Sequence, residues 1–400
     1  MTAPSGRPSP WRVLAAATAL IAPVGAIYAF SVFLRPLEAL LGLGRADLAL
    51  VFAVAAAGFG VGMMLAPTLY GRLAASWLVL GCAGISALGI ALAATADGLP
   101  RLAVGYGVLF GLGGGAAYIL VQQMANLAVT ARHGLVNGYL VSLLPAGAMV
   151  GAPVFGWAIR LFGVRATLGG FAATLALTGL ASAWLIARSG VTLAAATAVA
   201  IDARERRRAV FWRLSVVFFL AASAGLMVLS QAAGIIAAYG GATSLAVYGT
   251  TFITATVAGG RLGGGWMVDW LAIPSLAVGA HALALVGHLS LWLWPGPGVA
   301  VAALALVGLG YGIMSGVTAA AVAVYWRRAL YGRMASRVYI AWSAAAIVLP
   351  IVAGRLFDLT QGYATAVLIA AIGNALGMVA AAGLPRQRAV TAVAEVPSRP

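Results

Sequence analysis

Charged residues are scarce in this 400-residue chain, and lysine is missing altogether. Asp, Glu, Lys and Arg make up 8% of the residues and hydrophobic types 63%, with a mean hydropathy of +1.03. Soluble domains carry about 25% charged residues. This balance excludes a water-soluble fold, a disordered chain and a disulfide-rich secreted scaffold. What remains is a polytopic membrane protein.

Reactive side chains are also few. The single cysteine, Cys82, lies inside an apolar run, so the chain cannot form an intramolecular disulfide. The sequence offers no Ser/His/Asp set, no Cys/His pair and no metal cluster, and without lysine it has no Walker-type phosphate loop. The two histidines His281 and His288 lie seven residues apart, which favours a structural or lipid-interface role over metal binding. We therefore expect no enzyme activity, no metal and no cofactor.

Long apolar runs account for most of the chain. A span of the hydrocarbon core needs about 20 residues, and each run reaches this length. The runs cover residues 11–33, 46–70, 77–96, 101–126, 135–159, 164–187, 212–238, 245–269, 273–294, 299–325, 334–356 and 362–384. The sequence thus predicts an all-α integral membrane protein with twelve transmembrane helices.

The longest polar insertion divides these helices six and six. We expect an N-terminal six-helix bundle over 1–187, a central loop over 188–211, a C-terminal six-helix bundle over 212–385 and a tail over 386–400. The basic residues are all arginines, and most of them fall on one side when both termini are placed in the cytoplasm. The central loop and the tail are then cytoplasmic, in an inner membrane. Because the arginines lie between apolar runs without a stripe of stacking aromatics, nucleic acid is not an expected partner.

The two halves of the sequence repeat each other. The stretch Leu109-Phe-Gly-Leu-Gly matches Leu306-Val-Gly-Leu-Gly at an offset of about 197 residues. Gly71 and Ala75 correspond in the same way to Gly265 and Asp269. A duplicated six-helix unit is typical of transporters, which place the substrate site near the bilayer midplane at the repeat interface.

Arg261 is the most informative residue, because it lies in the interior of the eighth apolar run. An arginine there costs about 2.5–3.5 kcal/mol, so it should face a cavity and meet an anion. Snorkelling toward the interface, or a structural ion pair, is the alternative. The acidic residues all lie at helix ends or in loops, which favours an organic anion as the partner. Further polar side chains that are candidates to line a cavity are Tyr28, Ser31, Tyr118, Gln122, Gln123, Gln231 and Tyr311.

Several stretches resemble the major facilitator superfamily, and within it the group of oxalate/formate antiporters and monocarboxylate transporters. In the first run, Tyr28-Ala-Phe-Ser-Val-Phe-Leu-Arg-Pro-Leu is similar to that group's Tyr-x-x-Ser-x-Phe-x-x-Pro-Leu. The Gly-rich stretch ending at Tyr118 and the pattern Arg261, Gly265, Asp269 are similar to its fourth and eighth helices. The stretch from Tyr339 through Trp342 to Pro350 resembles its eleventh.

This resemblance implies a major facilitator fold and roles for individual residues. Arg261 would bind the substrate carboxylate, and Tyr118 and Tyr311 would donate hydrogen bonds to it. Trp342 occupies the place of a lysine that gives oxalate carriers their second positive charge, so a monocarboxylate is expected rather than oxalate. The remaining predicted residues fall into two groups. Tyr28, Ser31, Trp342, Gln122 and Gln231 would complete the substrate site, and Asp269, Gly265 and Gly71 belong to a gating or structural motif.

The sequence therefore predicts a secondary transporter that moves a small organic anion by alternating access and functions as a monomer in the bilayer. The positions that carry an Asn and an acid in related carriers are Val257 and Ala238, which leaves open whether a proton is coupled or an anion is exchanged. Two other readings remain. One is an exporter of hydrophobic or drug-like compounds, and the other is a non-transporting membrane sensor.

Overall fold

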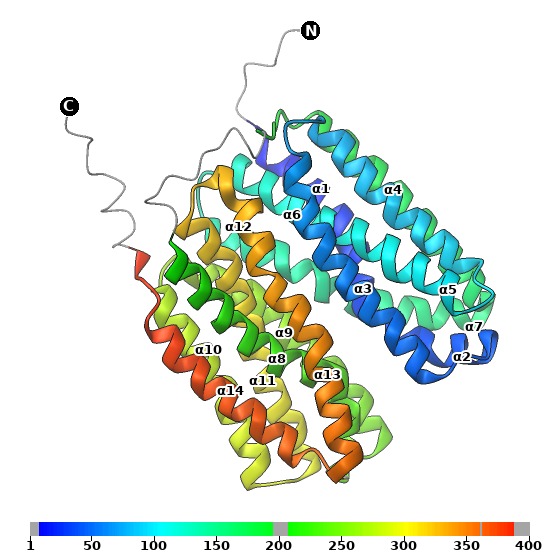
Figure 1. Cartoon of the computed structure of the whole chain (residues 1–400), viewed down its shortest axis with the longest axis vertical. Coiled ribbons are helices and arrows are strands. Elements are labelled where there is room, and N and C mark those ends of the chain that lie inside the picture. Colours follow the sequence, from blue (N-terminus) through cyan, green and yellow to red (C-terminus); the bar gives the residue numbers. More distant parts are fainter. Residues whose placement is uncertain (1–7, 195–206, 361, 388–400) are drawn as a thin grey trace. The chain divides into compact units, whose positions relative to one another are not determined.

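The computed structural model (Figure 1) describes residues 8–194, 207–360 and 362–387, without the side chains of residues 349, 350 and 358. Most of the expected tail over 386–400 and the middle of the expected central loop therefore lie outside the described residues. Within those ranges the chain is helical, and its only β-type pairing is an isolated bridge between Tyr70 and Leu73.

The first half of the chain forms a series of long, partly irregular helices. Some continue directly through a tight 3₁₀ or wide π segment, as η1 does between α1 and α2. In chain order the segments are α1 (Pro10–Val24), η1 (Gly25–Phe33), α2 (Leu34–Leu41), α3 (Arg45–Leu65), η2 (Ala66–Leu69), α4 (Ala75–Ala94), α5 (Leu99–Leu102), η3 (Ala103–Phe110), α6 (Gly111–Ala128) and α7 (His133–Ala187).

The second half follows the same pattern. Its segments are α8 (Arg208–Ala238), α9 (Thr243–Val268), α10 (Ile273–Leu293), α11 (Pro297–Tyr325), η5 (Arg328–Leu330), α12 (Tyr331–Val338), α13 (Ile340–Thr360) and α14 (Ala364–Ala382).

These segments amount to the twelve expected spans. Among the described residues, ten helical stretches are long and apolar enough to cross a membrane. One of them, His133–Ala187, is two spans, because Gly163 adopts φ 78° and ψ 171° and breaks the helix there. Glycine is the residue that accepts a positive φ without strain. The helix α9 is the twelfth, with Arg261 in its interior. The all-α fold with twelve transmembrane helices is thus confirmed.

The contacts group the chain into two compact units, each containing one segment from the other half of the sequence. Unit 1 comprises Met1–Ala131, Leu143–Ala200 and Arg328–Ser343, and unit 2 comprises Arg132–Ser142, Ile201–Arg327 and Ala344–Pro400. In unit 1, α3 and α4 pack along α6 and η3. In unit 2, α11 packs against α8, α9 and α10, and α14 packs against α8 and α10.

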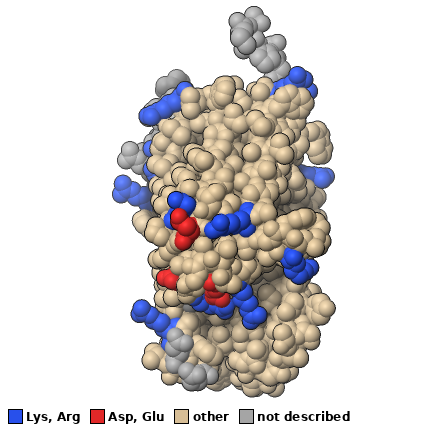
Figure 2. All heavy atoms as spheres, turned by 90° about the vertical axis from the view of Figure 1, so that its right-hand side faces the viewer, with Lys and Arg blue, Asp and Glu red and all other residues tan. Residues whose placement is uncertain are grey.

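The surface of the described chain is largely apolar. On the face drawn in Figure 2, uncharged residues cover most of the area, and only a few arginine and acidic side chains interrupt them. Large hydrophobic side chains such as Leu88, Leu177 and Trp184 are exposed. In water such patches would drive association, whereas the acyl chains of a bilayer solvate them.

Candidate functional site

Arg261 is buried in the core of unit 2, where only 2% of its surface is accessible. Its Nη1 donates a hydrogen bond to the backbone carbonyl of Val141 at 3.0 Å, and its Nη2 donates to the hydroxyl of Tyr311 at 2.9 Å. Both acceptors are neutral oxygens. The guanidinium stays protonated in proteins, so a positive charge is buried at this point.

Tyr311 on α11 supports Arg261 in two ways. Besides accepting the hydrogen bond, its ring lies under the guanidinium, with 5.3 Å between the ring centroid and Cζ of Arg261. The ring itself rests on Gly225 of α8, where a Cβ atom would overlap it. Three helices of unit 2 thus hold one cation, through a hydrogen bond, a cation–π contact and a close approach at glycine.

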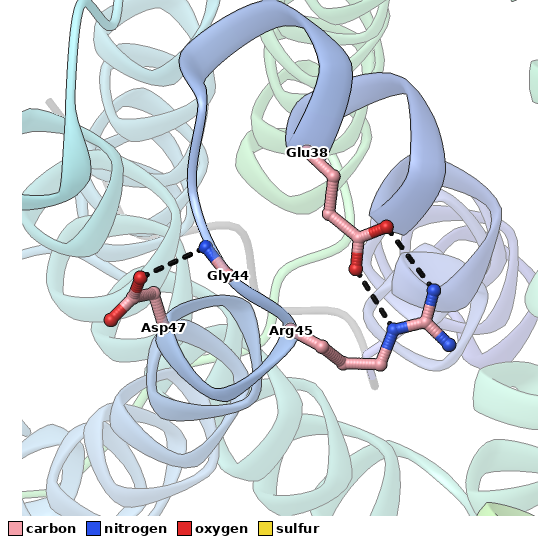
Figure 3. A network of polar contacts seen from close by, with 4 residues as sticks. All are labelled: Glu38, Gly44, Arg45 and Asp47. Atoms are coloured by element: carbon pink, nitrogen blue, oxygen red, sulfur yellow. Dashed lines mark hydrogen bonds and ion pairs between the residues drawn. The ribbon is translucent and has the colours of Figure 1, made fainter.

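The described carboxylates have other partners. Glu38 forms a two-pronged ion pair with Arg45, at 2.8 and 3.2 Å, and Asp47 accepts a hydrogen bond from the Gly44 amide (Figure 3). Asp97 pairs with Arg101 four residues along the chain. All three acids lie at or near helix ends in unit 1, as the sequence predicts.

Asp269 completes the N-terminus of α7 within unit 2. Its two carboxylate oxygens accept hydrogen bonds from the backbone amides of Gly134 and Leu135, at 2.8 and 2.9 Å. The first amides of a helix have no partner inside the helix, and its N-terminal end carries partial positive charge. An acid from α9's end therefore acts as the cap of α7. Gly265, one turn earlier, lets the backbone at Gly138 approach closely, because a Cβ there would overlap it.

The corresponding motif in unit 1 lacks the carboxylate. Gly71 adopts φ 74° in the turn before α4, a conformation that explains the glycine. Ala75 is the first residue of α4 and stands where the second half has Asp269.

Three predicted aromatic residues of unit 1 lie in one series of rings. Tyr28 meets Trp342 edge-on with 6.2 Å between centroids, and Phe59 lies 5.7 Å from both Trp342 and Tyr118. Tyr118 continues the series to Tyr339 at 5.8 Å. Such edge and tilted arrangements are favourable for aromatic pairs. Tyr28, Tyr118 and Trp342 therefore share one neighbourhood.

Gln122 and Gln123 fasten the segment 328–343 to α6 inside unit 1. The Oε1 atom of Gln122 accepts hydrogen bonds from the hydroxyls of Tyr331 and Tyr339, at 2.6 and 3.1 Å. Gln123 accepts from the Gly332 amide at 2.6 Å and donates to the Arg328 carbonyl at 3.0 Å. Both glutamines are buried, and these bonds satisfy polar groups that would otherwise be costly there.

The two remaining predicted residues lie in different surroundings. Ser31 is exposed on η1. Gln231 on α8 accepts a hydrogen bond from the Tyr363 hydroxyl at 3.2 Å. Of the predicted substrate residues in unit 2, Arg261 and Tyr311 contact each other directly. Unit 1 holds Tyr28, Ser31, Tyr118, Gln122 and Trp342, and unit 2 holds Arg261, Tyr311 and Gln231.

The sequence did not single out Val141, Tyr331 or Tyr339 as polar partners. Val141 acts through its backbone carbonyl, which leaves no trace in the side-chain pattern. Tyr331 lies in a short, arginine-rich stretch that is read as a loop from its charge. Tyr331 and Tyr339 are eight residues apart, which is just over two helical turns. This spacing is the one signal that could have placed both hydroxyls on a single helix face.

Comparison with known proteins agrees with this architecture. The sequence profile of the Major Facilitator Superfamily matches residues 14–343. No curated protein gives a significant sequence match. Among solved structures, the proton:xylose symporter XylE bound to 6-bromo-6-deoxy-D-glucose is similar with a TM-score of 0.74 and 14% identity, over 94% of this chain and 96% of that one.

A second structural relative is the fucose:proton symporter FucP of E. coli, solved as a single-site variant. It is similar with a TM-score of 0.69 and 17% identity, over 92% of this chain and 97% of that one. Another FucP structure, in the outward conformation, has a TM-score of 0.65 and 15% identity over 91% and 97%. At such identities the likeness concerns the fold, and the profile match over most of the chain concerns the family. The chain belongs to the Major Facilitator Superfamily of transporters.

Proposed function

We propose that this transporter moves a small organic anion, a monocarboxylate in preference to oxalate, across the cytoplasmic membrane by alternating access. The observation that carries the proposal is the buried guanidinium of Arg261, held between the neutral oxygens of Val141 and Tyr311. The planar guanidinium fork matches the geometry of a carboxylate, which it binds through two parallel charge-assisted hydrogen bonds.

The number of positive charges favours a substrate with one carboxylate. Oxalate carries two, and in the carriers that this sequence resembles a lysine supplies the second counter-charge. Here the corresponding residue is Trp342, which packs against Tyr28 and Phe59. A second carboxylate near these rings would lose its hydration without gaining a cation, which is costly in an apolar surrounding.

The other parts of the proposal follow from the sequence. Tyr118 and Tyr311 would donate hydrogen bonds to the substrate, with Tyr28, Ser31, Trp342, Gln122 and Gln231 around it. Both termini and the central loop would lie in the cytoplasm. The loop would connect the six-helix bundles 1–187 and 212–385. Coupling would use a proton or an exchanged anion, in a monomer.

Ligand-induced thermal stabilisation of the purified protein tests the substrate class. The panel contains formate, acetate, lactate and benzoate, with oxalate and succinate as dianions and xylose and fucose as neutral compounds. A ligand at about 100 times its Kd stabilises the native state by about 2.7 kcal/mol. We expect at least one monocarboxylate, and neither sugar, to raise the melting temperature of the wild type and of Arg355→Gln.

The same ligand should leave Arg261→Gln unshifted. Arg355→Gln is the matched control, because it removes an exposed arginine from α13 in the same unit. Stabilisation of Arg261→Gln equal to that of the wild type would remove Arg261 from the site. Stabilisation by a sugar alone would show that the substrate is a neutral compound and not an organic anion.

One observation favours a second candidate, an exporter of hydrophobic compounds. The five rings from Tyr28 to Tyr339 in unit 1 form one aromatic cluster, and aromatic rings of this kind pack well against a lipophilic molecule. Efflux of a lipophilic dye that lactate and benzoate do not inhibit would support this exporter. Inhibition of that efflux by the same monocarboxylates would instead support an organic anion as the substrate.

A further inference from the structure

The side chain of Gln387 joins the end of one transmembrane helix to the start of the next. Its Nε2 donates hydrogen bonds to the carbonyls of Val268 and Leu271, at 3.2 and 2.8 Å. Its Oε1 accepts a hydrogen bond from the amide of Ile273 at 3.0 Å. Gln387 is thus bonded three times to the turn between α9 and α10.

The chemistry of a primary amide fits this turn. Val268 is the last residue of α9, and its carbonyl is one of those that a helix leaves without an internal partner. Ile273 is the first residue of α10, and its amide is likewise without an internal partner. A glutamine carries both the donors and the acceptor required, whereas a carboxylate has no donor and an ammonium has no acceptor.

Two further contacts fix the segment that presents Gln387. The hydroxyl of Tyr325, at the end of α11, donates to the Pro385 carbonyl at 2.7 Å. Arg213, near the start of α8, donates to the Gly383 carbonyl. We call residues 383–387 the C-terminal strap. It is held by α8, by α11 and by the α9–α10 turn, all within unit 2.

The turn that Gln387 binds also carries Asp269. This residue follows Val268 directly, and its carboxylate supplies the cap that the Gly134 and Leu135 amides of α7 receive. Just before α7, Arg132 has φ 53°, a backbone conformation that is uncommon outside glycine. The start of α7 therefore depends on the orientation of a carboxylate from another helix, and that carboxylate depends on the turn.

We propose that Gln387 is a positioning residue that acts through Asp269. By fixing the α9–α10 turn, the C-terminal strap keeps the Asp269 carboxylate aimed at the first amides of α7. The strap thereby couples the C-terminal end of the last transmembrane helix to the contact between Asp269 and residues 132–142 at the start of α7. This coupling does not depend on the identity of the substrate, so it can fail or hold independently of the proposed anion transport.

Amide hydrogen exchange of the full-length protein in lipid nanodiscs tests this coupling. The readout is the exchange rate in peptides covering residues 132–142, which lie far from Gln387 in the sequence. In Gln387→Ala we expect this rate to rise about fivefold, the effect of weakening the Asp269 cap of α7 by about 1 kcal/mol. Gln387→Glu should behave like the alanine variant, because its carboxylate cannot donate to the two carbonyls.

Arg386→Ala is the matched control, since Arg386 is exposed on the same strap. It should leave exchange over 132–142 at the wild-type rate. Equal rates in Gln387→Ala and the wild type would overturn the proposal. So would an equal rise in Arg386→Ala, because the effect would then follow from any change in the strap.

A double-mutant cycle separates positioning from general stabilisation. Asp269→Ala alone should raise exchange over 132–142, because it removes the cap itself. If Gln387 acts through Asp269, adding Gln387→Ala should change this rate no further, since residues in one network are non-additive. Rates that multiply in the double variant would show that Gln387 acts on α7 by another route, and the proposed role would be wrong.

Discussion

At the scale of single residues, the main feature is one charged arginine, Arg261, that is buried in an apolar core. Burial of a guanidinium is costly unless its N–H groups have hydrogen-bond acceptors. Arg261 bonds to the Val141 carbonyl and to Tyr311, and Gly225 makes room for the tyrosine ring. Tyr311 and Gly225 each give a separate test.

Replacing Tyr311 with phenylalanine removes the hydroxyl and keeps the ring. The bond to a charged group is worth about 1.5–3 kcal/mol, so we expect a lower thermal stability and weaker stabilisation by monocarboxylates. Tyr248→Phe is the control, because Tyr248 is 75% exposed on α9. Indistinguishable melting curves for the two variants would mean that the hydroxyl contributes nothing to holding Arg261.

Replacing Gly225 with alanine should displace the Tyr311 ring. Overpacking of this kind costs about 1–3 kcal/mol. Gly259→Ala on α9 is the matched control, since a Cβ there meets no atom within 4 Å and alanine favours a helix. We expect thermal unfolding to show a loss for Gly225→Ala alone. A loss of the same size in both would point to general sensitivity of glycines.

At the scale of elements, polar contacts join helices that apolar packing alone leaves free to slide in lipid. His281 of α10 bonds through Nδ1 to the Asn374 side chain of α14 at 2.9 Å, and its ring lies against Gly377 one turn further on. His288 bonds back to the Ala284 carbonyl at 2.7 Å. Both histidines are buried inside unit 2. Burial and these contacts support a structural role for them over a lipid-interface role.

The contact between α10 and α14 gives a test at this scale. A Cβ at Gly377 would overlap the His281 ring, whereas at Gly373 on the same helix its nearest neighbour lies 3.8 Å away. We therefore expect Gly377→Ala to lower the stability by about 1–3 kcal/mol and Gly373→Ala to leave it nearly unchanged. Thermal unfolding in one detergent compares them directly. Equal stability of both variants would show that the ring has room to move.

The course of the helices could largely be predicted from hydropathy, because a bilayer demands long uninterrupted helices. The expected run 77–96 is α4 within two residues, and the break expected after 159 falls at Gly163. Hydropathy predicts that the first helix ends near Phe33, whereas the helical stretch continues to Leu41. Its last turns contain Arg35 and Glu38. A hydropathy profile places the end of the helix before such charged residues, although the helical backbone continues past them.

The candidate site could be predicted only where a side chain is unusual for its surroundings. Arg261 stands out because no other arginine lies near the middle of an apolar run, and Tyr311 because of its polar group in a Gly-rich helix. Neither Val141, the partner of Arg261, nor Gln387, which belongs to the C-terminal strap, could be inferred. The first contributes a backbone atom, and the second lies beyond the last apolar run, where one sequence gives no register.

At the scale of the whole molecule, the arginines predict its orientation in the membrane. In a Cys82→Ala background, Gly98→Cys lies between α4 and α5, on the side expected outside, and Thr192→Cys lies just after α7, on the side expected in the cytoplasm. A membrane-impermeant maleimide should label the first in intact cells and the second only after permeabilisation. The reverse labelling pattern would place both termini outside.

The central claim is that Arg261 binds a transported monocarboxylate. It is tested most directly by uptake into proteoliposomes of the radiolabelled monocarboxylate that best stabilises the protein, with oxalate beside it. We expect saturable uptake of the monocarboxylate by the wild type and by Arg355→Gln, little uptake of oxalate, and loss of saturable uptake in Arg261→Gln with normal folding. Saturable uptake by Arg261→Gln at the wild-type rate would contradict it.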